Sequence, residues 1–230
     1  MILDLIREGI TPESVITLGL YLIVILISLS VHELFHGYIA YRCGDATARN
    51  LGRLTINPLA HLDPLGTIMM LCFGFGYAKP VPINPRNFNH FKRDLCFVSL
   101  AGPLSNLVLA FIGAFVYDLS MMFMPITAIP VQYWLIFCTY FITANASLAV
   151  FNLLPIPPLD GSRILSTLLP GKISYFYLKY EQYIMIAVFA LLYLGVLDGI
   201  LSFFVGHLLS GIFAVEEFIL SPVFKMVYGA

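Results

Sequence analysis

The residues best suited to chemistry in this 230-residue chain are in the run His32-Glu33-Leu34-Phe35-His36. The two histidines are four residues apart, so on a helix their imidazoles share one face and can bind the same zinc ion. The glutamate between them lies beside that face, where its carboxylate can act as a general base toward a zinc-bound water. The pattern therefore predicts a zinc centre that activates water.

A catalytic zinc has three protein ligands and one open position for water, so a third ligand must come from elsewhere in the chain. The extended form of the motif needs Gly at position 39 and His at position 42, where this chain has Ile39 and Arg42. No glutamate occurs between Glu33 and Glu181. We therefore expect the third ligand to be an Asp, His or Cys.

Asp160 is the best candidate, because it follows a long apolar stretch and the helix-breaking run Pro155-Ile156-Pro157-Pro158. Such a break lets a carboxylate leave the helical ladder and turn toward a neighbouring helix. The alternative is that Asp160 caps a helix starting near Ser162. A loop position, or a bond to a neighbouring helix, explains the remaining candidates, which are His61, Asp63, His90 and His207.

The composition places these groups in a membrane protein. Hydrophobic residues make up 60% of the chain and charged residues 11%, and the mean hydropathy is +0.90. An average soluble domain has roughly 45–50% apolar and about 25% charged residues. Too few charged residues remain to cover a soluble surface, which excludes a soluble enzyme, a disordered tail and a nucleic-acid binder. The four cysteines lack CxxC spacing and indicate neither disulfides nor a cysteine-bound zinc.

The hydropathy pattern predicts an all-α polytopic membrane protein with about five transmembrane helices. The expected crossings are residues 15–41, 95–117, 131–154, 182–197 and 199–215, and the last two should form a tight hairpin turning at Asp198-Gly199. Residues 65–77 are too short for a helical crossing, which needs about 20 residues, and are expected to form a re-entrant segment. The zinc site would then lie between the first and third spans.

Basic residues predict the orientation of these spans. Eleven of the twelve Lys and Arg residues fall on one side, and only Arg7 falls on the other. An excess of Lys and Arg marks the cytoplasmic side, so we expect the N-terminus outside and the C-terminus in the cytoplasm. With Arg42 at the cytoplasmic surface, His36 lies about 9 Å and His32 about 15 Å deeper. Ionisable groups at that depth are functional candidates by default.

Five motifs, taken in order, resemble the site-2 protease family of intramembrane zinc metalloproteases. They are His32-Glu33-xx-His36, Gly52-Arg53-Leu54-Thr55-Ile56-Asn57-Pro58, Lys79-Pro80-Val81-Pro82, Ala101-Gly102-Pro103-Leu104-Ser105-Asn106 and Asn152-xx-Pro155-x-Pro157-x-Leu159-Asp160-Gly161. The resemblance implies that His32, His36 and Asp160 bind one Zn²⁺ per chain. It also implies that Glu33 activates the water, and that Asn152 hydrogen-bonds the substrate carbonyl or the developing oxyanion.

The expected function follows from this resemblance. We expect hydrolysis of peptide bonds within, or near the cytoplasmic edge of, the transmembrane segments of substrate proteins. The partners would be the lipid bilayer and a membrane-protein substrate whose transmembrane segment unwinds. No nucleic acid is expected, and formation of a homo-oligomer is left as an open alternative. The expected location is a bacterial inner membrane, with the active site toward the cytoplasm. Residues 1–230 would form one protease domain without PDZ or CBS modules, with a core at 15–165 and a helical hairpin at 182–215.

Two features should serve the reaction. Residues 71–87, with glycines and alternating prolines, are expected to clamp the unwound substrate as an added strand, the alternative being a water-bridging loop. Asn106, Asn145 and Asn152 are expected to line a polar cavity that admits water. Two other functions stay open. One is a catalytically idle, chaperone-like binder of membrane helices, against which the intact Glu33 argues, and the other is a metal transporter.

Overall fold

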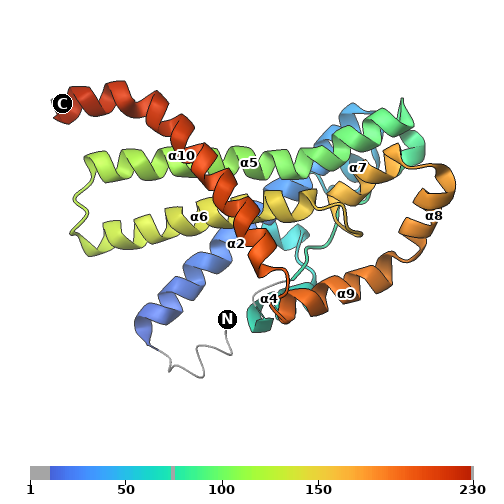
Figure 1. The fold of residues 1–230 in the computed structure, drawn as a ribbon, viewed down its shortest axis with the longest axis horizontal. Helices are drawn as coiled ribbons and strands as arrows, with labels where there is room; N and C mark the ends of the chain where they lie inside the picture. Colours follow the sequence, from blue (N-terminus) through green and yellow to red (C-terminus); the bar gives the residue numbers. More distant parts are fainter. Residues whose placement is uncertain (1–10, 74–75, 229–230) are drawn as a thin grey trace.

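Four long helices dominate the computed structural model, which describes residues 11–73 and 76–228 (Figure 1). They are α2 (Pro12–Arg42), α5 (Phe91–Phe123), α6 (Ile129–Leu153) and α10 (Asp198–Tyr228). Each contains an apolar stretch long enough to cross a membrane. No strand occurs within the described ranges. The prediction of an all-α polytopic membrane protein is therefore confirmed.

The long helices pack through small side chains. Helices α5 and α6 lie side by side, α2 packs against both of them, and α10 crosses α6 and α5 (Figure 1). Between α5, α6 and α10 the core consists of Ala110, Ala114, Ile142, Ala146 and Ile212, all buried. Alanine allows helix backbones to approach closely, which is how helices gain packing energy where lipid removes the hydrophobic driving force.

The start of α2 shows a complete capping box. The Thr11 hydroxyl accepts a hydrogen bond from the Ser14 backbone N–H at 3.1 Å, and the Ser14 hydroxyl accepts one from the Thr11 N–H at 3.0 Å. Pro12 occupies the first helical position, where its missing N–H costs nothing. These signals begin α2 three residues before the predicted start, and the helix ends at Arg42, one residue beyond the prediction.

A break in the chain after α6 places Asp160 at the start of a new helix. Helix α6 ends at Leu153, and after a short irregular stretch α7 (Asp160–Leu168) begins and packs against α5. Gly161 makes this break possible, because a side chain there would meet the Leu153 carbonyl oxygen at 2.2 Å. Two short helices follow, α8 (Gly171–Lys179) and α9 (Glu181–Tyr193).

The segment between α2 and α5 contains short helices and extended chain. The helices are α3 (Thr47–Asn50), η1 (Pro58–Ala60), α4 (Pro64–Phe73) and η2 (Pro85–Asn87). The Lys79 backbone N–H donates to the His61 carbonyl at 2.8 Å, so the chain returns after α4 to the point from which it left. This return agrees with the expected re-entrant segment, of which residues 74–75 lie outside the described residues.

The crossing predicted at residues 182–197 is not supported by the structure. Helix α9 has 13 residues, shorter than the roughly 20 that a crossing needs. It ends in a Schellman motif, in which Gly195 adopts a φ of 70° while the Gly195 and Val196 N–H groups bond to the Leu192 and Leu191 carbonyls. The turn therefore comes before Asp198, which instead begins α10.

The predicted C-terminal hairpin is wrong, because α9 and α10 diverge after the turn (Figure 1). Helix α10 packs on α6 and α5. Its far end lies at the end of the bundle where α5 connects to α6, opposite α7 and α8. The structure thus separates Lys225 from the other predicted cytoplasmic basic residues and does not support a C-terminus on their side.

Candidate metal centre

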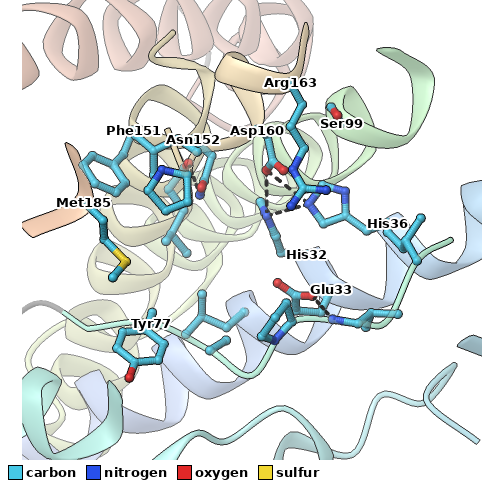
Figure 2. Close-up of a pocket in the computed structure, with 18 of the residues that line it drawn as sticks. His32, Glu33, His36, Tyr77, Ser99, Phe151, Asn152, Asp160, Arg163 and Met185 are labelled. Atoms are coloured by element: carbon cyan, nitrogen blue, oxygen red, sulfur yellow. Dashed lines mark hydrogen bonds and ion pairs between the residues drawn. The ribbon is translucent and has the colours of Figure 1, made fainter. Parts of the chain in front are cut away.

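Three side chains converge between α2 and the start of α7. His32 and His36 project from α2, and Asp160 is the first residue of α7 (Figure 2). The two Nε2 atoms lie 2.9 Å apart, and Asp160 Oδ2 lies 3.2 Å from that of His32 and 3.1 Å from that of His36. The ligand atoms of a tetrahedral zinc, with bonds of about 2.0–2.1 Å, lie about 3.3 Å from one another. The three groups fit that geometry closely.

Both imidazoles use Nδ1 for a hydrogen bond to the protein, which leaves both Nε2 atoms available to bind a metal ion. His36 Nδ1–H donates to the Val98 carbonyl at 2.6 Å, and His32 Nδ1–H donates to Asn106 Oδ1 at 2.5 Å. An imidazole that carries its proton on Nδ1 presents a lone pair on Nε2. Two such lone pairs and a carboxylate oxygen then face one another in a buried site, where mutual repulsion disfavours them unless a cation lies between. The donor set is thus one that a metal ion stabilises.

A buried polar network fixes the Asn106 amide. Its Nδ2 donates to Asn145 Oδ1 at 2.8 Å, which leaves Oδ1 to accept from His32. Asn145 Nδ2 in turn donates to Ser28 Oγ at 2.9 Å. Asn106, Asn145 and Ser28 are fully buried and do not line the cavity at the metal centre. The prediction that Asn106 and Asn145 line a polar cavity is therefore wrong, because both amides are consumed in positioning His32.

Helix α5 approaches the metal ligands through a glycine. A Cβ atom at Gly102 would lie 2.3 Å from His36 Nε2 and 2.5 Å from His32 Nε2. Any side chain at this position would occupy the space that a bound ion needs. The expected role of Ala101–Asn106 in close helix packing is consistent with this approach, and Asn106 adds a direct bond to His32.

Asp160 does not cap a helix, as the alternative interpretation required. The N-cap position of α7 is Leu159, and no side chain bonds to the first turn. The Asp160 carboxylate is directed at the two histidines instead (Figure 2). The break after α6 thus has the consequence expected from the prolines, which is a carboxylate turned toward α2.

Glu33 lies next to this group and is held by the extended chain after α4. The Val81 backbone N–H donates to Glu33 Oε2 at 2.7 Å. Arg53 donates to the carbonyls of Lys79 and Pro80, at 3.0 and 3.3 Å, and so steadies that chain. Figure 2 shows Glu33 facing His32 from the side opposite Asp160.

A cavity of about 350 Å³ joins these groups. Its polar wall contains the three metal-ligand candidates, Glu33 and Asn152. The Asn152 amide donates to the Leu148 carbonyl of its own helix at 3.0 Å, so its bond to a substrate stays a prediction. The polar lining residues that sequence reasoning missed include Ser99 and Arg163. Arg163 had a signal, since it lies one helical turn after Asp160, whereas Ser99 had none.

The other candidate ligands lie apart from this centre. His61 is buried, contrary to the expectation of a solvated loop residue, and its Nε2 lies 2.9 Å from the Thr55 carbonyl. His90 is exposed, as expected. His207 bonds to the Phe203 carbonyl of its own helix rather than to a neighbouring one. Within the described residues, the four cysteines are free thiols.

Comparison with known proteins decides the family. The sequence pattern of peptidase family M50 matches residues 20–130 and 119–195, which is well over half of the chain. The chain belongs to peptidase family M50. This membership confirms the resemblance to site-2 proteases, and it makes the protein a membrane-integrated zinc metalloprotease of that type.

Several M50-type relatives have names that begin "Putative zinc metalloprotease". YwhC of Bacillus subtilis strain 168 is 45% identical over 170 residues, which cover 71% of this chain and 75% of the relative. Rip2 of Mycolicibacterium smegmatis is 34% identical (67% and 59% covered), and MJ0611 of Methanocaldococcus jannaschii is 33% identical (58% and 62% covered). The match thus spans about three fifths of the last two proteins. No solved structure gives a significant match.

Proposed function

We propose that the protein hydrolyses peptide bonds within the transmembrane segments of other membrane proteins, or near their cytoplasmic edge, using one zinc ion per chain. His32, His36 and Asp160 would hold the ion. The observation that carries the proposal is the shared cavity, which brings three metal-ligand candidates and the Glu33 carboxylate together. Membership of family M50 supports the same chemistry.

The chain's own groups can move the protons that hydrolysis requires. Bound zinc supplies a water of lowered pKa and polarises the scissile carbonyl. Glu33 accepts the water proton at its carboxylate and donates it to the leaving amine nitrogen. The Val81 N–H bond to Oε2 fixes the carboxylate, so that the other oxygen faces the cavity. Asn152 would donate to the carbonyl oxygen after releasing its bond to Leu148.

The chemistry of the centre requires an unwound substrate. A helical segment keeps its carbonyls in hydrogen bonds to its own backbone, so the segment must unwind before a peptide group can reach the cavity. Extended chain at residues 76–83 forms one wall, which supports docking of the substrate beside it as an added strand.

We also propose that the centre faces the cytoplasm of a bacterial cell, in the inner membrane. The start of α5, the end of α6, and α7 and α8 lie at one end of the bundle (Figure 1). Most of the Lys and Arg residues belong to this end, including Arg42, Lys92, Arg163 and Lys172. An excess of Lys and Arg marks the cytoplasmic side. The partners would be lipid and a membrane-protein substrate, with no nucleic acid.

The test compares Glu33→Gln with the wild type after co-reconstitution with bacterial single-span membrane proteins in vesicles of phosphatidylethanolamine and phosphatidylglycerol. Mass spectrometry of released peptides reports cleavage, and elemental analysis reports zinc. We expect Glu33→Gln to keep zinc and lose cleavage, while Glu217→Gln, which changes an exposed carboxyl on α10, keeps both. Absence of cleavage by zinc-loaded wild type would favour the idle binder, and cleavage by Glu33→Gln would refute the assigned base.

A further inference from the structure

Helix α9 presents one face to the metal-centre cavity. Four of its residues line that cavity: Glu181, Met185, Val188 and Phe189. Their spacing of four, three and one residues places them on a single side of the helix. The opposite side is exposed, with Tyr183 at 70% and Ile186 at 64% of full exposure. The two sides of α9 therefore meet different surroundings.

Packing against the spanning helices does not explain the cavity-facing side. The close contacts of α9 are with α8, at its own N-terminal end. Val188 is nevertheless only 6% exposed. The same cavity is lined by Leu29 of α2 and by Leu148 and Phe151 of α6. Met185 and Phe151 lie together on the side of the cavity away from His36 (Figure 2).

The cavity thus has two kinds of lining. One part holds the metal-ligand candidates, Glu33 and Asn152, where a scissile peptide group must lie. The residues that α9 adds to the same cavity are apolar apart from Glu181, which lies one helical turn before Met185, so a side chain next to the scissile bond can extend toward Met185 and Val188. A carboxylate buried among these side chains would lose its hydrogen bonds to water, which disfavours its binding there.

We propose that Met185 and Val188 form a specificity pocket that takes one large apolar side chain adjacent to the scissile bond of the substrate. This inference rests on the proposed protease function and adds its substrate preference. Helix α9 is then the wall that selects the cleavage site, while α2 and α7 carry the chemistry. A Leu, Met or Phe side chain matches the apolar lining, and an Asp side chain, which Glu181 on the same helix side would also repel, does not.

The test measures binding of zinc-directed probes to the zinc-loaded full chain in detergent, without any cleavage step. Acetohydroxamate has no side chain, N-acetyl-leucine hydroxamate has an apolar one, and N-acetyl-aspartate hydroxamate has a charged one. We expect the leucine probe to bind wild type at least about tenfold more tightly than acetohydroxamate. The aspartate probe should have no such advantage.

Matched variants on neighbouring residues assign the effect to the pocket. Met185→Ala and Val188→Ala should reduce the leucine advantage to about threefold or less while acetohydroxamate binding and zinc content stay unchanged. Met185→Leu should restore the advantage. Ile186→Ala, one residue away on the exposed side, should keep it in full.

The results distinguish a failure of the specificity pocket from a failure of the proposed protease function. An equal leucine advantage in Met185→Ala and Ile186→Ala would overturn the pocket assignment, as would a wild type that binds all three probes equally. If zinc-loaded wild type bound none of the probes, the metal centre would have no open ligand position, and the proposed function would fail before the question of specificity arose.

Discussion

His32 Nδ1 lies 2.5 Å from Asn106 Oδ1, and this contact joins the metal centre to a buried polar network between three helices. Asn106 comes from α5, its partner Asn145 from α6, and Ser28 from α2. The orientation of the His32 ring therefore depends on the packing of all three helices. Groups in this second layer fix the tautomer and the ring angle of a metal-binding histidine.

Replacing Asn106 with Ala should weaken zinc binding. The substitution removes the acceptor for His32 Nδ1–H and leaves the Asn145 amide without its donor, so the ring loses its preferred tautomer. Loss of such a partner typically costs 10–100-fold in metal affinity. Competition with a chromogenic chelator measures the affinity, and Asn152→Ala, which changes no bond to a histidine, is the control. Equal affinity in both variants would contradict the role of Asn106.

Gly102→Ala should exclude the metal from a folded protein. The added Cβ would lie 2.3 Å from His36 Nε2, within the space between the ligand atoms. We expect most of the zinc to be lost, with helix content retained by circular dichroism. Gly211→Ala in α10, where no atom lies within 4 Å of the added Cβ, should keep its zinc. Full zinc occupancy in Gly102→Ala would show that α5 can move away from the two histidines, contrary to this prediction.

Val81→Pro should lower the rate of cleavage without releasing zinc. Proline removes the N–H that binds Glu33 Oε2, and residue 81 lies outside any helix, between Pro80 and Pro82. One lost hydrogen bond to a charged group corresponds to about 1.5–3 kcal/mol, or roughly tenfold or more in rate. Val81→Ala keeps the N–H and should retain activity. A Val81→Pro variant with wild-type kcat would mean that Glu33 needs no such anchor.

Asp45 ties the chain after α4 to the end of α2 and makes that attachment sensitive to acid. Its carboxylate accepts from the Asn84 N–H at 2.7 Å and from Asn87 Nδ2 at 2.8 Å, and it also accepts from Thr47. Burial raises the pKa of Asp45, but these hydrogen bonds outweigh burial and lower it. A lowered folded-state pKa contributes stability above the unfolded value of about 3.9, and this is lost as the pH falls below it.

Replacement of Asp45 with Asn should therefore remove that contribution at neutral pH. We expect faster proteolysis at residues 76–88, and a smaller loss of stability between pH 5 and pH 3 than in the wild type. Limited proteolysis across this pH range measures both effects. Identical proteolysis rates for the two proteins at every pH would show that Asp45 does not cause the acid sensitivity of this attachment.

Much of the metal centre could be predicted from side-chain types and spacing. The separation of His32 and His36 already implies a shared helix face, and the prolines before Asp160 imply a carboxylate leaving its helix. The hydrogen bonds that the Val98 carbonyl and the Val81 N–H make to the site could not be predicted this way. Every residue except proline has both backbone groups, so residue type does not identify them. The partnership of Asn106 with Asn145 depends on the register between α5 and α6, which hydropathy does not reveal.

The C-terminal helices show where hydropathy misleads. Residues 183–197 contain no charged residue and are mostly apolar, so they resemble a crossing, yet a single glycine at position 195 ends α9 in a Schellman turn. Asp198-Gly199 has the composition of a turn but begins α10 instead. Helix α9 is mostly apolar both on the side that lines the cavity and on the side that is exposed. The spacing of its apolar residues therefore does not show which side faces the cavity.

The most direct test of the metal centre is the zinc content of the detergent-purified protein by elemental mass spectrometry, for the wild type, His32→Ala and Asp160→Ala. We expect about one zinc per chain in the wild type and loss of zinc in both variants, because the ligands come from two separate helices. A well-folded wild type without zinc would contradict the catalytic centre. Zinc retained in Asp160→Ala would contradict Asp160 as the third ligand.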